Sequence, residues 1–241
     1  MEIKLIALSF VLVLIPSLIT YKLKIGIEKE ILKNSIRALI QLSILGFVLG
    51  FLFQIENPLL YIPVVLFMLI YSSYIAKKRT SYSYKAAFLS LFFSTAIILT
   101  ILVTFKIISF KPNEFIPIAG MIIGNALNTY TLTIERLKRE IELQKELIEA
   151  FIAIGAKYSQ ALNIMRKEAI KAALIPVNNM LQTIGVVAIP GITTGMLLAG
   201  ASPLKAVSYQ IVIIYMLVSI NLFSSLFGSY FYIREKLGSY S

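Results

Sequence analysis

The sequence predicts an all-helical integral membrane protein with about seven transmembrane helices. Hydrophobic residues make up 58% of the 241 residues and charged residues only 15%, whereas soluble proteins carry about 25% charged residues. Apolar runs recur along the chain, and runs of roughly 20 residues are long enough to cross a bilayer as helices. They lack the strict alternation of membrane β-barrel strands. The pattern therefore predicts an all-α protein embedded in the lipid bilayer of the cell membrane.

Seven apolar segments are predicted to span this membrane as one transmembrane domain, 1–241. They are the ranges 3–21, 38–54, 58–76, 86–105, 115–134, 172–199 and 204–233. The first segment is followed by its basic residues, Lys22 and Lys24. A signal peptide has its basic residues before the apolar run. The first segment is therefore interpreted as a span that stays in the protein.

Basic residues gather in alternate loops between these spans. All but four of the 23 Lys and Arg residues fall on one side, and the exceptions are Lys4, Lys106, Lys111 and Lys205. Because cytoplasmic loops carry an excess of basic residues, the N-terminus is predicted outside and the C-terminus inside. The formal charge of +11 is attributed to these loops, so nucleic acid is not an expected partner.

One long polar stretch, 135–171, is predicted to be a cytoplasmic helical hairpin. From 134 to 155 apolar residues recur at helical spacing without Pro or Gly before Gly155, which predicts one continuous amphipathic helix. Gly155 is expected to end that helix. Ser159 is expected to cap a second helix, 160–171, that returns to the membrane. The hairpin then forms a compact projection below the bilayer.

The turn of this hairpin carries apolar residues beside charged ones, which is typical of a partner-binding site. Its sequence, Glu149-Ala150-Phe151-x-x-x-Gly155-Ala156, resembles the EAA loop of ABC-transporter permeases. In those proteins a short coupling helix docks in a cleft of the nucleotide-binding subunit. The resemblance implies that Glu149, Ala150, Phe151, Gly155 and Ala156 form an ATPase-coupling site. The proline of the importer form comes later here, at Pro176.

Further motifs in the C-terminal half resemble one permease family. They are Gly120-Met121-Ile122-Ile123-Gly124-Asn125, Glu135-Arg136-Leu137, Pro176-Val177-Asn178-Asn179-Met180, Pro190-Gly191-Ile192-Thr193-Thr194-Gly195, Gly200-Ala201-Ser202-Pro203 and Tyr209-Gln210-Ile211. As a set they resemble the FetB-like iron-export ABC permeases, which are related to plant aluminium-tolerance membrane proteins. The resemblance implies a homodimer that exports iron or a related metal. Where the family has Met-Met-Thr-Gly-Gln, this chain has Ile192-Thr193-Thr194-Gly195-Met196, which leaves the cargo open.

Polar residues near the prolines of the sixth span predict a translocation pathway. Proline kinks or breaks a helix, and interrupted membrane helices occur where freed backbone groups are buried in protein or line a cavity. The candidate pathway residues are Asn125, Asn128, Asn178, Asn179, Gln182, Pro190, Gly191, Thr193 and Thr194. Small and amide-bearing residues also hold membrane helices together, so pathway lining and helix packing both stay open.

The source of energy is predicted to lie on another polypeptide. No ionisable residue falls near the centre of a predicted span, although proton-coupled carriers need buried charges. The phosphate-binding sequence Gly-x-x-x-x-Gly-Lys-Ser/Thr is also absent. The chain is therefore predicted to be neither an enzyme nor a cofactor-binding protein, with ATP and Mg²⁺ held by an ABC ATP-binding subunit.

Three alternatives to an ATP-driven metal exporter stay open. They are an ATP-independent channel or facilitator, an ABC permease for a non-metal solute, and a membrane scaffold. Cys and His are absent from the chain, and these residues are the commonest strong metal ligands. No metal ligands are therefore assigned.

Overall fold

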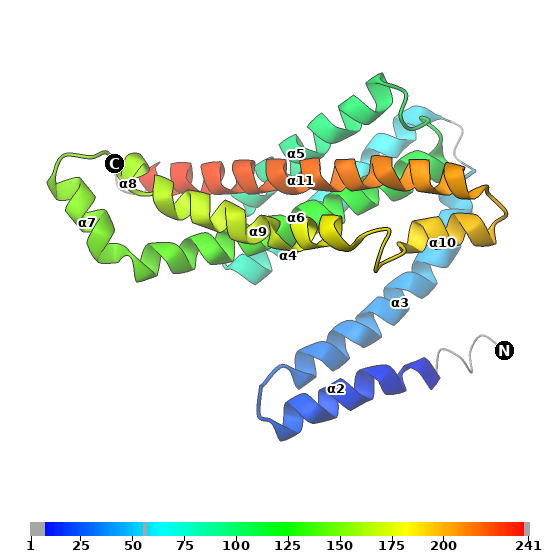
Figure 1. Cartoon of the computed structure of the whole chain (residues 1–241), viewed down its shortest axis with the longest axis horizontal. Coiled ribbons are helices and arrows are strands. Elements are labelled where there is room, and N and C mark those ends of the chain that lie inside the picture. The colour runs from blue at the N-terminus through cyan, green and yellow to red at the C-terminus, as the bar shows by residue number, and fades with distance from the viewer. Residues whose placement is uncertain (1–7, 55–56, 239–241) are drawn as a thin grey trace. The chain divides into compact units, whose positions relative to one another are not determined.

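The computed structural model describes residues 8–54 and 57–238, and these ranges are mostly helical (Figure 1). The elements are α2 (Val11–Lys22), α3 (Glu28–Leu52), the short 3₁₀ helix η1 (Pro58–Leu60), α4 (Tyr61–Thr80), α5 (Tyr84–Thr104), α6 (Pro112–Leu143), α7 (Lys145–Ala153), α8 (Tyr158–Ala161), α9 (Asn163–Thr183), α10 (Gly191–Leu198) and α11 (Pro203–Gly238). Lys4 and the first five residues of the span predicted at 3–21 lie outside the described ranges. The all-α prediction is confirmed.

The chain divides into two compact units, residues 1–56 and 57–241. In the first unit α2 and α3 pack against each other as a helical hairpin. The connecting turn contains Lys24 and Gly26, which both have positive φ. No residue of α3 is buried, and Phe47 and Phe51 are among its most exposed side chains. An apolar surface of this extent suits contact with lipid or with another protein.

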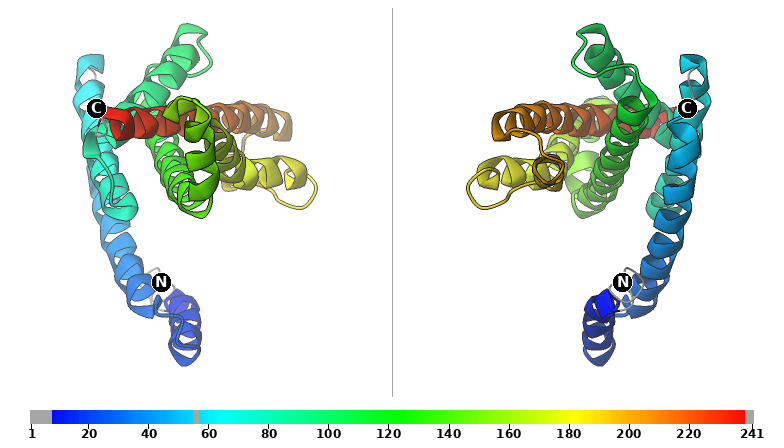
Figure 2. Two further views of the ribbon diagram at one scale, coloured as in Figure 1. Left: turned by 90° about the vertical axis from the view of Figure 1, so that its left-hand side faces the viewer. Right: turned by 90° about the vertical axis from the view of Figure 1, so that its right-hand side faces the viewer.

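The second unit is a helix bundle built around α6. This helix contacts α4, α5, α9 and α11 and buries Ile116, Ile122, Tyr130, Ile134 and Leu137 almost completely. The turned views of Figure 2 show α9 and α11 lying against α6, in agreement with these contacts. Within this unit α7 and α8 lie at one end and α10 lies at the other (Figure 1).

Small and polar residues on one face of α11 hold it against α5 and α6. We call these residues the α11 stripe, and they are Asn221, Ser224, Ser225 and Gly228. Ser224 Oγ donates a hydrogen bond to the Ala126 carbonyl oxygen (2.7 Å), and Ser90 Oγ donates to the Ser224 carbonyl oxygen (3.2 Å). Lipid offers helices no hydrophobic driving force to associate, so close packing and such hydrogen bonds join them instead.

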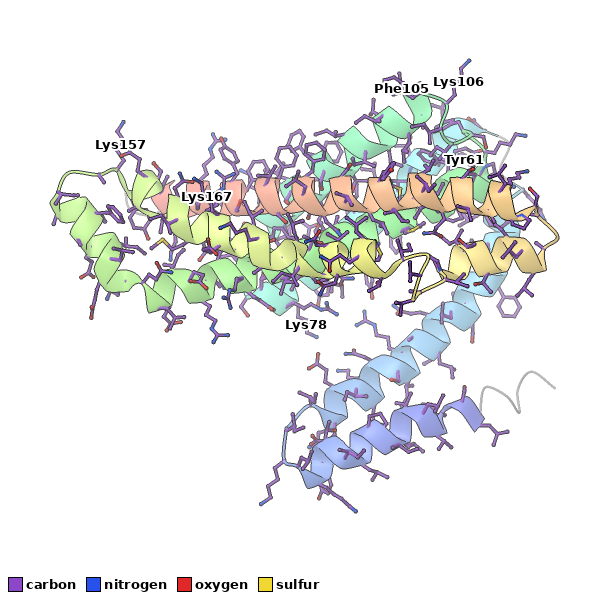
Figure 3. All side chains as sticks on the ribbon, in the orientation of Figure 1. Tyr61, Lys78, Phe105, Lys106, Lys157 and Lys167 are labelled. Atoms are coloured by element: carbon purple, nitrogen blue, oxygen red, sulfur yellow. The ribbon has the colours of Figure 1, made fainter. Side chains whose placement is uncertain are left out.

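Aromatic rings connect the start of α4 with the start of α6 and the loop before it, at the α10 end of the second unit. The ring of Tyr61, the first residue of α4, lies 5.5 Å from that of Phe110 and 6.1 Å from that of Phe115. Figure 3 shows Lys106 toward this end and Lys157 toward the α7 end. Two segments that are predicted to lie on the same side of the membrane are thus neighbours in space.

Four of the described helices, α3, α5, α6 and α11, are long and apolar enough to cross a membrane. The shorter helix α2 is also apolar, and α4 ends in three consecutive basic residues. The sixth predicted span is divided between α9 and α10. Each predicted span thus has helical residues, and the count of seven stays a prediction.

Two local predictions about the course of the chain are wrong. The helix predicted as continuous over 134–155 is interrupted, since α6 ends at Leu143, α7 begins at Lys145, and Gln144 has φ −112° and ψ 28°. Pro176 does not break the sixth span, because it lies inside α9. The interruption comes at residues 184–190, where the backbone leaves the helical conformation.

Replacing Gly228 by Ala is expected to lower the thermal unfolding midpoint of the purified protein in detergent. The new Cβ would lie 2.8 Å from Cδ2 of Tyr130, and overpacking of this kind costs about 1–3 kcal/mol. Gly124→Ala is the matched control, because no atom lies within 4 Å of a Cβ built there. Equal midpoints for the two variants would contradict a spacing role for the α11 stripe.

Candidate functional site

The motif predicted to couple to an ATPase lies on α7 and the turn that follows it. Ile148 is buried and anchors the helix to the bundle, whereas Glu149 and Ala150 are exposed. Ile152 is exposed as well, and Ile154 exposes 80% of its surface. Exposed apolar side chains beside a carboxylate form the kind of surface that another protein covers.

The turn after α7 requires the conformation of Gly155, whose φ is +90°. The Ala156 N–H donates to the Phe151 carbonyl oxygen (3.0 Å), and the Gly155 N–H donates to the Ile152 carbonyl oxygen (2.9 Å). These two bonds define a Schellman motif, in which the left-handed position is usually Gly. The prediction that Gly155 ends the helix is confirmed, and Phe151 and Ala156 are brought together across the turn.

The chain returns toward the bundle through α8 and α9. The Gln160 side chain accepts a hydrogen bond from the Lys157 N–H (2.9 Å), so the N-cap position is Lys157. The prediction that Ser159 caps this helix is therefore wrong, because the helix begins two residues earlier, at Tyr158. Arg166 Nε donates to Ser229 Oγ (3.0 Å), which ties the start of α9 to α11.

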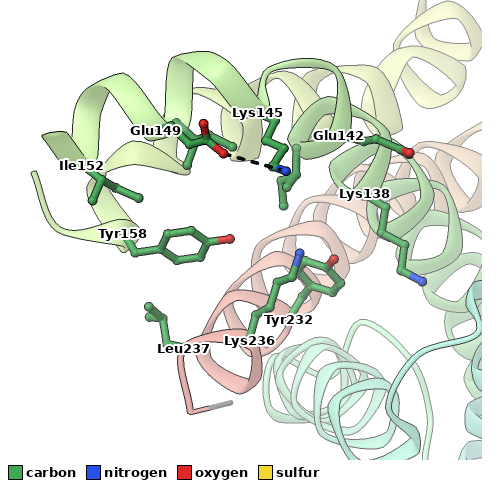
Figure 4. A pocket seen from close by; sticks show the side chains of 11 residues that line it. Lys138, Glu142, Lys145, Glu149, Ile152, Tyr158, Tyr232, Lys236 and Leu237 are labelled. Carbon is green, nitrogen blue, oxygen red and sulfur yellow. Dashed lines mark ion pairs between the residues drawn. The ribbon is translucent and has the colours of Figure 1, made fainter. Parts of the chain in front are cut away.

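A groove of about 700 Å³ lies beside α7 (Figure 4). We call it the α7 groove, and it is formed by residues of α6, α7, α8 and α11, among them Ile141, Ile152, Glu142 and Lys236. Lys145 Nζ lies 3.9 Å from a Glu149 carboxylate oxygen along its rim. An exposed pair of this spacing contributes at most about 0.5 kcal/mol. Apolar walls with charges of both signs suit a docking protein chain.

The turn 81–83 between α4 and α5 is fastened to the same end of the bundle. Lys138 Nζ donates to the Thr80 carbonyl oxygen (2.6 Å) and lies 5.6 Å from the centre of the Tyr82 ring. Tyr82 Oη donates to the Tyr232 carbonyl oxygen (3.1 Å). A movement of α6 or α11 at this end would therefore also move the turn between α4 and α5.

Burial shifts two pKa values in this cluster. It lowers the pKa of Lys138, with a further lowering by Lys236 and an opposing effect of Glu135. Burial also raises the pKa of Tyr82, and the carboxylate of Glu235 raises it further. The Tyr82 hydroxyl therefore stays protonated at cellular pH and remains a hydrogen-bond donor.

A second cavity, of about 250 Å³, lies among α6, α9 and α11. It is lined by Asn125, Asn128, Thr129 and Leu132 of α6, by Ala173, Pro176, Val177 and Met180 of α9, and by Leu217 and Asn221 of α11. On α6 and α9 these positions have the spacing of a single helix face. We call this cavity the polar pocket. It brings two predicted pathway residues, Asn125 and Asn128, together with a third amide.

The other predicted pathway residues on α9 lie outside the polar pocket. Asn178 lines a neighbouring cavity of about 390 Å³ between α9 and α11. Asn179 and Gln182 are exposed on the surface of α9. The structure therefore separates these polar residues onto different faces of the helix.

The predicted pathway residues near α10 lie at or beyond the interruption of the sixth span. Pro190 is the N-cap residue of α10 and Gly191 is its first residue. Thr193 is buried and its Oγ1 donates to Gln210 of α11 (3.3 Å). Thr194 is exposed, and its Oγ1 donates to the carbonyl oxygen of Pro190 (3.2 Å). Thr193 therefore has a helix-packing contact.

The sequence predicts no site role for three polar residues of this region, Thr129, Gln210 and Asn221, although Gln210 belongs to one of the family motifs. Thr129 Oγ1 donates to Asn221 Oδ1 (2.8 Å) inside the bundle. Asn221 could have been predicted, because it is an amide in the middle of a long apolar helix. Polar groups within a membrane are costly and are usually functional or paired.

These features define a class of protein. The chain is a multi-pass membrane protein, all-helical in its described ranges, with several helices of membrane-spanning length and a polar pocket among them. Polar cavities beside interrupted helices are typical of membrane transport proteins. More specifically, the chain belongs to the uncharacterised protein family UPF0014, whose model matches residues 3–237.

Similar proteins occur in bacteria and plants. The chain is 36% identical to the "Probable iron export permease protein FetB" of Escherichia coli over 97% of its own length and 92% of the relative. It is 35% identical to the "Protein ALUMINUM SENSITIVE 3" of Arabidopsis thaliana over 93% and 83% of the two chains. It is 33% identical to the "UPF0014 membrane protein STAR2" of Oryza sativa over 88% and 75%. None of these names describes an enzyme, and no solved structure matches the chain.

Lys138→Met is expected to lower the thermal unfolding midpoint in detergent, because it removes the hydrogen bond to Thr80 and the contact with Tyr82. A hydrogen bond from a charged group is worth about 1.5–3 kcal/mol, and partial exposure places the expected loss near the lower value. Lys145→Met is the matched control, since the Lys145 side chain is 78% exposed. A larger loss for the control would contradict the role given to Lys138.

Proposed function

We propose that this protein is the transmembrane permease subunit of an ABC transporter in the cell membrane. It exports iron or a related metal and is driven by a separate ATP-binding subunit. Membership of the family and the name of the Escherichia coli relative support a permease. The observation that carries the ABC assignment is the Glu149–Ala156 motif, which lies on a short exposed helix and a glycine turn at one end of the bundle.

Contacts within the second unit support the predicted seven-span topology, with the N-terminus outside and the C-terminus inside. The turn 81–83, the Lys138 region of α6 and the end of α11 all belong to the predicted inner side, and they meet around Tyr82. Segments of the predicted outer side also meet one another, since Tyr209 Oη lies 3.5 Å from a carboxylate oxygen of Glu114. The α7 end then faces the cytoplasm, where ATP is present.

The surface of α7 is suited to transmit force from an ATPase. Ile152 and Ile154 offer apolar contact area next to Glu149, and the Gly155 turn holds them in one arrangement. The chain lacks a phosphate-binding loop, so ATP and Mg²⁺ bind to the partner subunit. Movement of α7 passes to α6 directly and to α9 through α8, and α6 and α9 also line the polar pocket. Because ABC ATPases act in pairs, two copies of this chain assemble with two ATPase subunits.

Variants of the α7 turn test the ATPase assignment. The chain is coexpressed with an ABC ATPase of the same genome that has no membrane spans, and ATP hydrolysis by the reconstituted complex is measured. Gly155→Val is expected to lower hydrolysis about tenfold, because a left-handed conformation costs a branched residue about 1–2 kcal/mol or more. Glu149→Lys is expected to lower it by charge reversal. Lys167→Gln on α9 is the control, and unchanged hydrolysis in both α7 variants would defeat the docking assignment.

Single cysteines test the orientation, because the chain contains no native Cys. Asn113→Cys is expected to react with a membrane-impermeant maleimide in intact cells, since exposed Asn113 lies on the predicted outer side. Ser159→Cys, exposed beside α7, is expected to react only after the cells are permeabilised. The reverse pattern would contradict a C-terminus inside the cell.

A further inference from the structure

The polar pocket contains hydrogen-bonding groups but no ionisable one. Its polar lining consists of the amides of Asn125, Asn128 and Asn221, the hydroxyl of Thr129 and the thioether of Met180. Among the described residues, no group of three or more His, Cys, Asp or Glu side chains is placed to hold a metal ion. The pocket therefore offers a ligand neutral dipoles and no counter-charge.

The polar pocket lies near the middle of the bundle. On α6, the pocket residues Asn125 and Asn128 lie between the charged residues Glu114 and Glu135. At 1.5 Å per residue, Asn125 is about 15 Å from either carboxylate along the helix axis. That distance is half the thickness of a hydrocarbon core of about 30 Å. In the proposed topology the pocket thus opens at the depth where an uncompensated charge is most costly.

Several hydrogen-bonding atoms in the pocket are left for a ligand. Asn125 Nδ2 donates a hydrogen bond to the Met121 carbonyl oxygen (2.9 Å). The Oδ1 atom of Asn125 can still accept a hydrogen bond from a ligand. Asn221 Oδ1 accepts a hydrogen bond from Thr129 Oγ1 (2.8 Å). The NH₂ group of Asn221 can still donate to a ligand. The Asn128 side chain is exposed, lines the cavity and makes no hydrogen bond within the described ranges. Donors and acceptors are therefore both available.

We infer that the polar pocket binds a cargo of little net charge through hydrogen bonds, either a metal already enclosed by oxygen ligands or a metal-free polar organic molecule. A bare multivalent cation loses its hydration on entering such a site, and without carboxylates the loss is not offset. A cargo whose own ligands neutralise the charge avoids this cost, and its outer oxygens match the free amides. The inference deepens the proposed function by naming a class of cargo.

Equilibrium dialysis of the purified full-length chain in detergent tests the inference without an ATPase. The probes are the neutral complex ferric tris(acetohydroxamate) and anaerobic ferrous ion, each carrying the same radioactive iron isotope. The complex is expected to bind and the bare ion is not. Competition by metal-free acetohydroxamic acid separates the two sources, since equal competition identifies an organic cargo and its absence identifies the complex.

Two substitutions at Asn128 distinguish a neutral cargo from a bare cation. Asn128→Leu is expected to weaken binding of the complex at least tenfold by removing its hydrogen bonds. Asn128→Asp is expected to weaken it without creating a site for ferrous ion. Asn163→Leu and Asn163→Asp are the matched controls, since Asn163 is exposed at the start of α9 and outside the pocket.

Binding of ferrous ion that strengthens in Asn128→Asp would overturn the inference, and so would the absence of binding by every probe. Either result leaves the ATPase-coupled function standing, because that function is tested by hydrolysis in the α7 variants. Conversely, binding of the complex by a chain that has no ATPase partner would contradict the proposed function and leave this inference standing.

Discussion

The close contact between α11 and α6 is the constraint on which the second unit depends. At Gly228 the backbone of α11 meets the ring of Tyr130, with no room for a side chain between them. One turn earlier, Ser224 Oγ donates to a carbonyl oxygen of α6 (2.7 Å). In a membrane neither contact is replaced by water, so both fix the distance between two helices that each extend over most of the unit.

The α11 stripe also connects the two candidate sites. Asn221, at one end of the stripe, lines the polar pocket and bonds Thr129 of α6. Beyond the other end of the stripe, Ser229 accepts the bond from Arg166 at the start of α9, and Tyr232 accepts the bond from Tyr82. A displacement of α7 therefore acts on helices whose spacing is already fixed at one face. The contacts between α6 and α9, which include part of the pocket lining, lie outside the α11 stripe.

The helical class and the glycine turn after α7 are predicted correctly from the sequence because both depend on local properties. Apolar run length determines the helices, and Gly155 ends α7 because few other residues adopt its positive φ. The α11 stripe was not predicted, because the roles of Ser224 and Gly228 depend on contacts with α6, a helix distant in the sequence. Pro176 illustrates the opposite error. Proline usually interrupts a helix, but α9 continues through Pro176 in the structure. The helical conformation is lost at residues 184–190 instead.

The separation of charge from the polar pocket limits how a ligand would be held there. Lys138, Glu149 and Lys236 gather around the α7 groove. The polar groups of the polar pocket, which shares only α6 and α11 with that groove, are amides, a hydroxyl and a thioether. A neutral hydrogen bond contributes about 0.5–1.5 kcal/mol, so the loss of two or three bonds to the amides and hydroxyl of α6 and α11 lowers affinity by about one to three orders of magnitude. A carboxylate cage around a bare ion would require far more work to open. A neutral pocket therefore holds a ligand by bonds that a modest change in its lining is enough to break.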